Sequence, residues 1–141
     1  MPEEHCGVQW LGRAAVVTLP GEIDLTNADQ IREDLLAILG RGATTVVADM
    51  TGTTFCDSAG VNALVRVHKR AAAEGAAMRL AVSAPAVRRV LTITGVDSLI
   101  ELYPGVEAAL ADVRQPSTDD GPEIPPANIR TDPDGLAPQP G

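Results

Sequence analysis

An aspartate and a serine, Asp57 and Ser58, stand where a buried strand is followed by a helix. The β-branched and apolar run 45–48 is typical of a strand buried on both faces, and residues 51–54 form a turn-rich break containing a glycine. Either Asp57 or Ser58 can cap the helix with a side-chain oxygen, and helix N-termini attract negative charge. A hydroxyl in this position is suited to accept or present a phosphate. The apolar stripe of the helix comprises Val61, Leu64, Val65, His68 and Ala72.

A nucleophilic role for Ser58 finds no support in the surrounding residues. The nucleophile elbow requires a glycine two positions before the serine, where this chain has Cys56. A general base is also required, but the two histidines are His5 and His68. His68 lies on the same helix, roughly 15 Å along its axis from Ser58 at about 1.5 Å of rise per residue. We therefore expect a protein that is not an enzyme, with no catalytic residues.

The composition of the chain changes near Arg114. Seven of the eleven prolines lie in the last 28 residues, where large apolar side chains are nearly absent. Such a segment cannot bury enough surface to offset its ordering entropy. The sequence therefore predicts one folded domain at 1–113 and a Pro-rich, acidic, disordered tail at 114–141, whose role the sequence leaves open.

The charge and residue usage exclude several function classes. The net charge is −8, and only three residues are aromatic, whereas nucleic-acid binding favours a basic surface with stacking rings. No apolar run approaches the roughly 20 residues of a membrane span, and the N-terminus lacks a signal-peptide pattern. Two cysteines form neither a disulfide framework nor a metal set. We expect a cytoplasmic protein without metal, cofactor, nucleic acid or membrane partner.

The order of elements predicts an α/β sandwich. A hairpin around Gly12-Arg13 is followed by alternating helices and strands, which favours a mixed sheet of four to five strands packed with about four helices. Thr26 with Asp29 resembles a capping box for the first helix. The expected strands cover 8–11, 14–19, 44–50, 78–82 and 99–102, and the expected helices begin near Thr26, Ser58, Pro85 and Pro104.

Several motifs together resemble the STAS domain, in particular the bacterial anti-sigma factor antagonists. The segment Asp57-Ser58-Ala59-Gly60-Val61 resembles the D-S-[SA]-G-[LV] core of the family, and Gly21-Glu22-Ile23-Asp24 resembles its G-E-[LIV]-D turn. Residues 83–91 and 94–97 resemble two later family segments, in the family's order and at about its spacing. The resemblance covers roughly residues 8–113 and implies the same α/β fold.

The resemblance also implies a function. Ser58 corresponds to the serine that a partner kinase phosphorylates in anti-sigma factor antagonists. The implied partners are an anti-sigma factor with serine-kinase activity and a serine phosphatase, and a weak homodimer is compatible with the sequence. The bare form would bind the anti-sigma factor and release a sigma factor, and phosphorylation would end binding. The implied partner-binding residues are Asp24, Asp57, Ser58, Ala59, Gly60 and Asn62.

Some alternatives stay open at this point. Asp57 and Asp24 are either turn and cap residues or part of a partner-facing surface. Ala59 replaces a second hydroxyl found in many relatives, which excludes phosphorylation there. Cys56 and His68 are interpreted as packed side chains. The competing function is a STAS scaffold or sensor module, stressosome-like or binding a small ligand, that Ser58 phosphorylation does not control.

Overall fold

The computed structural model describes residues 6–114. It divides after Ala109 into two units. Of the second unit, the described part holds one short helix, α5 (Ala111–Arg114). The predicted tail lies outside the described residues apart from Arg114, so its disorder and the domain boundary at 113 stay predictions.

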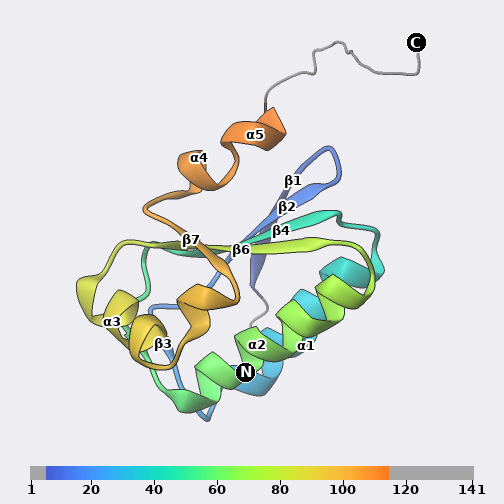
Figure 1. Ribbon diagram of the computed structural model, residues 1–141. Helices are drawn as coiled ribbons and strands as arrows, with labels where there is room; N and C mark the ends of the chain where they lie inside the picture. The colour runs from blue at the N-terminus through green and yellow to red at the C-terminus, as the bar shows by residue number, and fades with distance from the viewer. Residues whose placement is uncertain (1–5, 115–141) are drawn as a thin grey trace, which may run out of the picture. The chain divides into compact units, whose positions relative to one another are not determined.

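The first unit is a mixed five-stranded sheet with helices on both faces. The strand order is β1-β2-β4-β6-β7, with β1 antiparallel to β2 and all other pairs parallel. Helices α1, α2 and α3 cover one face, and α4 lies on the other (Figure 1). This arrangement confirms the predicted α/β sandwich with a mixed sheet. The strands of the sheet are β1 (Gly7–Leu11), β2 (Ala14–Thr18), β4 (Thr45–Met50), β6 (Ala77–Val82) and β7 (Glu101–Tyr103), and the helices are α1 (Ala28–Gly40), α2 (Ser58–Ala73), α3 (Pro85–Ile93) and α4 (Val106–Ala109).

The core explains why the central strand reads as a continuous apolar run. Val46, Val47 and Ala48 of β4 are fully buried, because neighbouring strands and helices enclose this strand on all sides. Leu35 of α1 and Leu64 of α2 are also buried, and α1 packs against α2. Of the stripe predicted for α2, Val61 and Leu64 are buried, Val65 and His68 are half-buried, and Ala72 is exposed, because the buried face runs through Val67 and Ala71.

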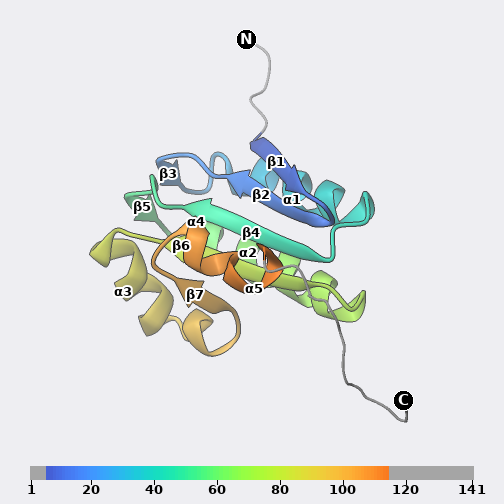
Figure 2. The ribbon, with the colours of Figure 1, turned by 90° about the horizontal axis from the view of Figure 1, so that it is seen from above.

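A second, two-stranded sheet lies beyond the carboxyl ends of β2 and β4. It pairs β3 (Glu22–Ile23) with β5 (Phe55–Cys56) in parallel. Figure 2 shows this small sheet at one end of the main sheet, next to α3. It connects the segment after β2 with the segment that enters α2.

Three sequence expectations need correction. The predicted capping box is wrong, because the Thr26 hydroxyl donates to Asp24 Oδ1 at 2.6 Å and α1 begins after Asn27. The last strand begins at Glu101 and not at Leu99, because the backbone N–H groups of Leu99 and Ile100 both donate to the Val96 carbonyl in a 3₁₀ turn, η1 (Val96–Ser98).

The single helix expected after Pro104 is replaced by the two short helices α4 and α5. A stretch of this length gains little from helix propagation, so one continuous helix is not enforced.

Candidate functional site

The site is built where two chain segments come together at the start of α2. In the small sheet, Glu22 pairs with Phe55 and Ile23 with Cys56. The ladder continues one step further, since the Asp57 backbone N–H donates to the Ile23 carbonyl at 3.1 Å. The segment that follows β3 is therefore held beside the segment that opens α2. The carboxyl ends of parallel strands are a common location for functional sites in α/β folds.

Asp57 is the N-cap of α2. Its Oδ1 accepts hydrogen bonds from the backbone N–H groups of Ala59 at 2.9 Å and Gly60 at 3.1 Å, and its carbonyl accepts from Val61 at 3.0 Å. The backbone of Asp57 is extended, as an N-cap requires. A cap of this kind contributes about 1 kcal/mol to stability. Of the two cap candidates in the sequence, the structure selects Asp57.

Ser58 is the first residue of α2, and it is exposed. Within residues 6–114 its hydroxyl makes no side-chain hydrogen bond, because Asp57 already occupies the cap position. The Ser58 hydroxyl therefore has no role in stabilising the helix. It stands at the positive end of a 16-residue helix, where an added anion is favoured electrostatically.

Asp24 organises the loop that follows β3. Its Oδ1 accepts from the Thr26 backbone N–H at 2.9 Å and from the Thr26 hydroxyl at 2.6 Å. These hydrogen bonds hold the pKa of the Asp24 carboxyl below its usual value. Asn27 closes the loop, as its Oδ1 accepts from the Asp24 backbone N–H and its Nδ2 donates to the Glu22 carbonyl. Asp24 is a turn residue whose carboxylate remains charged near neutral pH.

Gly60 allows α2 to approach the small sheet closely. A Cβ added at this position would lie 2.6 Å from Ile23 Cγ2 and 2.7 Å from Cys56 Sγ. Only glycine fits this contact without displacement of a neighbour. The glycine of the family motif therefore has a packing role here. Of the other two predicted partner-binding residues, Ala59 is half-buried and Asn62 is exposed, both in the first turns of α2.

The two side chains interpreted as packing residues, Cys56 and His68, are both at least partly buried. Cys56 is buried, and burial together with the nearby Asp57 carboxylate raises the pKa of its thiol to about 11. His68 is half-buried on α2.

Among residues 6–114, no group of three or more His, Cys, Asp or Glu side chains could hold a metal ion. In the same range, no helix has the length and apolarity to cross a membrane.

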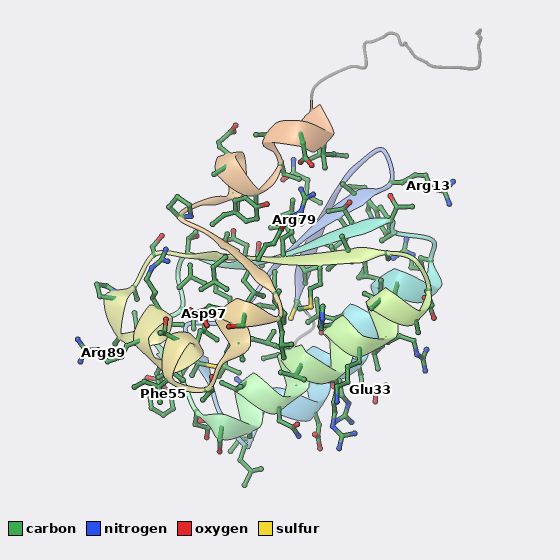
Figure 3. All side chains as sticks on the ribbon, viewed as in Figure 1. Arg13, Glu33, Phe55, Arg79, Arg89 and Asp97 are labelled. Carbon is green, nitrogen blue, oxygen red and sulfur yellow. The ribbon has the colours of Figure 1, made fainter. Side chains whose placement is uncertain are left out.

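Sequence reasoning missed two apolar side chains at the site. Leu25, directly after Asp24, is 79% exposed, and Phe55 of β5 is 50% exposed. Figure 3 shows Phe55 at the rim of the molecule below α3. The sequence signal that could have indicated their exposure was their position in polar, turn-rich segments without helical or strand periodicity. The structure brings them to the same end of the molecule as Asp24, Asp57 and Ser58.

Known proteins share this architecture. The family model described as STAS domain matches residues 7–109. An anti-sigma factor antagonist from Mycobacterium paratuberculosis superposes with a TM-score of 0.71 at 28% sequence identity, covering 77% of this chain and 92% of that one. The anti-sigma factor antagonist SpoIIAA in its unphosphorylated form gives a TM-score of 0.66 at 26% identity, covering 77% and 96%. The phosphorylated form of Bacillus SpoIIAA gives 0.61 at 25% identity, covering 77% and 99%.

Proposed function

The chain belongs to the STAS domain family, and from that premise we propose that it is an anti-sigma factor antagonist switched by phosphorylation of Ser58. The bare protein binds a cytoplasmic anti-sigma factor that is also a serine kinase, and this binding releases a sigma factor. Phosphorylated protein dissociates, and a serine phosphatase restores it. The protein acts by binding and not by catalysis. The antagonists among the similar solved structures support this class of partner.

One observation carries the proposal. Asp57 satisfies the first free N–H groups of α2, which leaves the Ser58 hydroxyl exposed and unengaged at the helix N-terminus. A serine that capped the helix would have to give up its cap to be modified. Here phosphorylation leaves the cap of α2 in place, so the modification changes the surface and not the fold.

The modification is a phosphoryl transfer from ATP. The Ser58 oxygen forms a bond to the γ-phosphorus, the bond from that phosphorus to the bridging oxygen of ADP breaks, and a base of the kinase takes the hydroxyl proton. Hydrolysis by the phosphatase releases inorganic phosphate and returns the hydroxyl. This chain supplies the acceptor hydroxyl and the rigid start of α2 that presents it.

The phosphate disrupts binding through charge and hydration. It adds about −1.5 to −2 charges at neutral pH, next to the Asp57 carboxylate. Asp57 cannot turn away without losing its two hydrogen bonds to Ala59 and Gly60. A partner packed over this end of α2 would have to desolvate both anions, which is costly.

The test is phosphoryl transfer by candidate anti-sigma factor kinases. Wild type and Ser58→Ala are incubated with kinase and ATP, and intact mass and peptide mapping report the modification. We expect one phosphate on Ser58 in wild type and none in the variant. Ser98→Ala is the matched control, because Ser98 is also exposed, in η1, and should leave the transfer unchanged. Transfer to another residue, or equal transfer to Ser58→Ala, contradicts the proposal.

A cavity favours a second candidate, a sensor module that binds a small ligand. It measures about 660 Å³ between β1, the end of β2 and α1, and is lined by Cys6, Leu19, Asn27 and Gln30 among others. Thr26 and Asn27 of its wall belong to the loop that Asp24 organises. Purification separates the two functions, since an antagonist should bring down a kinase-type anti-sigma factor, whereas a sensor module should carry a bound small molecule that denaturation releases.

A further inference from the structure

Each of the two paired segments that build the site carries one exposed apolar side chain. Leu25 is the most exposed large apolar residue in the described part of the chain, at 79%, and Phe55 is half exposed. Leu25 follows Asp24, and Phe55 precedes Ser58 by three positions. Isolated exposed apolar residues are common on proteins, but these two stand on paired segments that meet at the start of α2.

Both side chains stand on backbone that is already fixed. The loop that carries Leu25 is closed by hydrogen bonds on either side, from Thr26 to Asp24 and from Asn27 to Glu22. Phe55 lies in β5, paired with Glu22 of β3. An apolar side chain on a rigid backbone loses little further entropy on binding, which is the property of an interface anchor.

The two segments that carry the anchors are acidic, although Arg89 of the neighbouring α3 lies near Phe55 (Figure 3). Segments 20–29 and 51–65, which build this end of the molecule, contain no Lys or Arg. Their carboxylates belong to Glu22, Asp24, Asp29 and Asp57. A surface of this charge selects a partner of positive potential, and complementary potentials accelerate association and exclude wrong partners.

We propose that Leu25 and Phe55 are the apolar anchors of the complex, inserted into an apolar recess on the anti-sigma factor that is bordered by cationic groups. The inference rests on the proposed function and names the chemistry of its partner surface. The anchors provide most of the affinity, and the carboxylates mainly set the orientation and the rate of association.

The anchors also give the phosphate a physical means of release. The Asp57 backbone N–H donates to the Ile23 carbonyl, so Ser58 opens α2 next to the segment that carries Leu25 and three positions after Phe55. A phosphate there places a strongly hydrated dianion at the edge of the area that both anchors must keep dry. Desolvating an anion can cost more than its attraction to nearby cations returns. The cationic groups that border the recess therefore do not keep the phosphorylated protein bound.

The experiment compares the affinity of Leu25→Ser and Phe55→Ser with two matched controls for an anti-sigma factor kinase that binds wild type. Leu99→Ser matches Phe55 in exposure, at 53%, and Leu11→Ser matches Leu25 in residue type, at 36% exposure. Leu11 lies at the opposite end of the main sheet, since it pairs with the first residue of β2, and Leu99 lies outside both segments of the site, before β7. Phe55→Leu tests whether apolar character alone is sufficient.

We expect each anchor variant to weaken binding by about tenfold or more, in low and in high salt, and each control to stay within about twofold. Phe55→Leu should recover most of the affinity. Thermal unfolding of every variant verifies that the fold is kept. If the anchor variants bind like wild type, or lose no more than the controls, the inference is overturned while the proposed function stands. If wild type binds no anti-sigma factor, the proposed function fails and the inference fails with it.

Discussion

At the scale of single residues, the start of α2 divides two tasks between neighbouring side chains. Asp57 accepts the hydrogen bonds that hold the first turn, and Ser58 keeps an exposed hydroxyl. If the serine were the cap, a phosphate would exchange one helix contact for another. Because the aspartate is the cap, a phosphate on Ser58 changes only the charge and hydration of the surface.

The two cysteines show how burial controls reactivity near this site. Burial and the Asp57 carboxylate raise the pKa of the Cys56 thiol to about 11, and burial with the Asp34 carboxylate raises the pKa of Cys6 to about 12. Both thiols are therefore protonated in the folded protein at neutral pH. The thiolate is the reactive form, so Cys56 acts as an apolar filler beneath Ser58.

These raised pKa values predict a loss of stability at alkaline pH. Above the ordinary thiol pKa of 9.0, the unfolded chain loses a proton from Cys56 that the folded protein keeps, so the free energy of unfolding falls as pH rises. The loss from Cys56 is roughly 1 kcal/mol at pH 10. Urea unfolding at pH 8 and pH 10 measures it. Cys56→Ala should show a shallower pH dependence than wild type, and an equal dependence in both proteins would contradict the assignment.

At the scale of elements, the site depends on how closely α2 approaches the small sheet. Gly60 is the point of contact, facing Ile23 of β3 and Cys56 of β5. The same contact sets the position of the Ser58 hydroxyl relative to the Asp24 loop. The geometry of the switch is therefore fixed by packing between two elements, and a change there should affect both stability and phosphorylation.

Gly60→Ala is expected to destabilise the protein by about 1–3 kcal/mol, because the new methyl group overpacks the contact with Ile23 and Cys56. In a domain of this size each kcal/mol lowers Tm by roughly 4–8 °C. Gly40→Ala is the matched control, since a Cβ at the end of α1 meets nothing within 4 Å. It should leave Tm unchanged or raise it slightly. Equal Tm values for Gly60→Ala and wild type would show that the contact is loose.

The main elements could be predicted from the sequence because each carries a periodic pattern. The buried strand at 45–50 and the apolar stripe of α2 are long enough to define their periods. β3 and β5 contain two residues each and have no period. The capping box was misassigned because the carboxylate of Asp24, and not that of Asp29, accepts from the Thr26 backbone N–H, and the Thr26 hydroxyl donates to the same oxygen.

The predicted site residues Asp24, Asp57 and Ser58 do come together in space, because β3 and β5 pair in register. From the sequence, the proximity of these three residues could be predicted only through the family resemblance. The exposure of Leu25 and Phe55 was missed because apolar residues are usually expected in the core, and the turn-rich segments around them were the only contrary signal.

At the scale of the whole molecule, the proposed switch is one surface of an α/β sandwich. Residues 7–109 match the STAS family over one continuous domain, and the similar antagonists are covered over 92% and 96% of their own lengths. The segments 20–29 and 51–65 at the functional end contain carboxylates and no Lys or Arg, within a chain of net charge −8. On the proposed function, the partner supplies positive potential, and phosphorylation of Ser58 prevents dehydration of the contact area.

The most direct test measures the dissociation constant of one anti-sigma factor kinase for the bare protein and for the protein phosphorylated stoichiometrically on Ser58. Titration calorimetry with ADP in place of ATP avoids further transfer during the measurement. The account predicts that the phosphate weakens binding by about a hundredfold or more, because a hydrated dianion must be desolvated in the interface. Circular dichroism should be the same for both forms. Equal dissociation constants for the two forms would contradict the central claim and leave Ser58 as an exposed helical residue without a switching role.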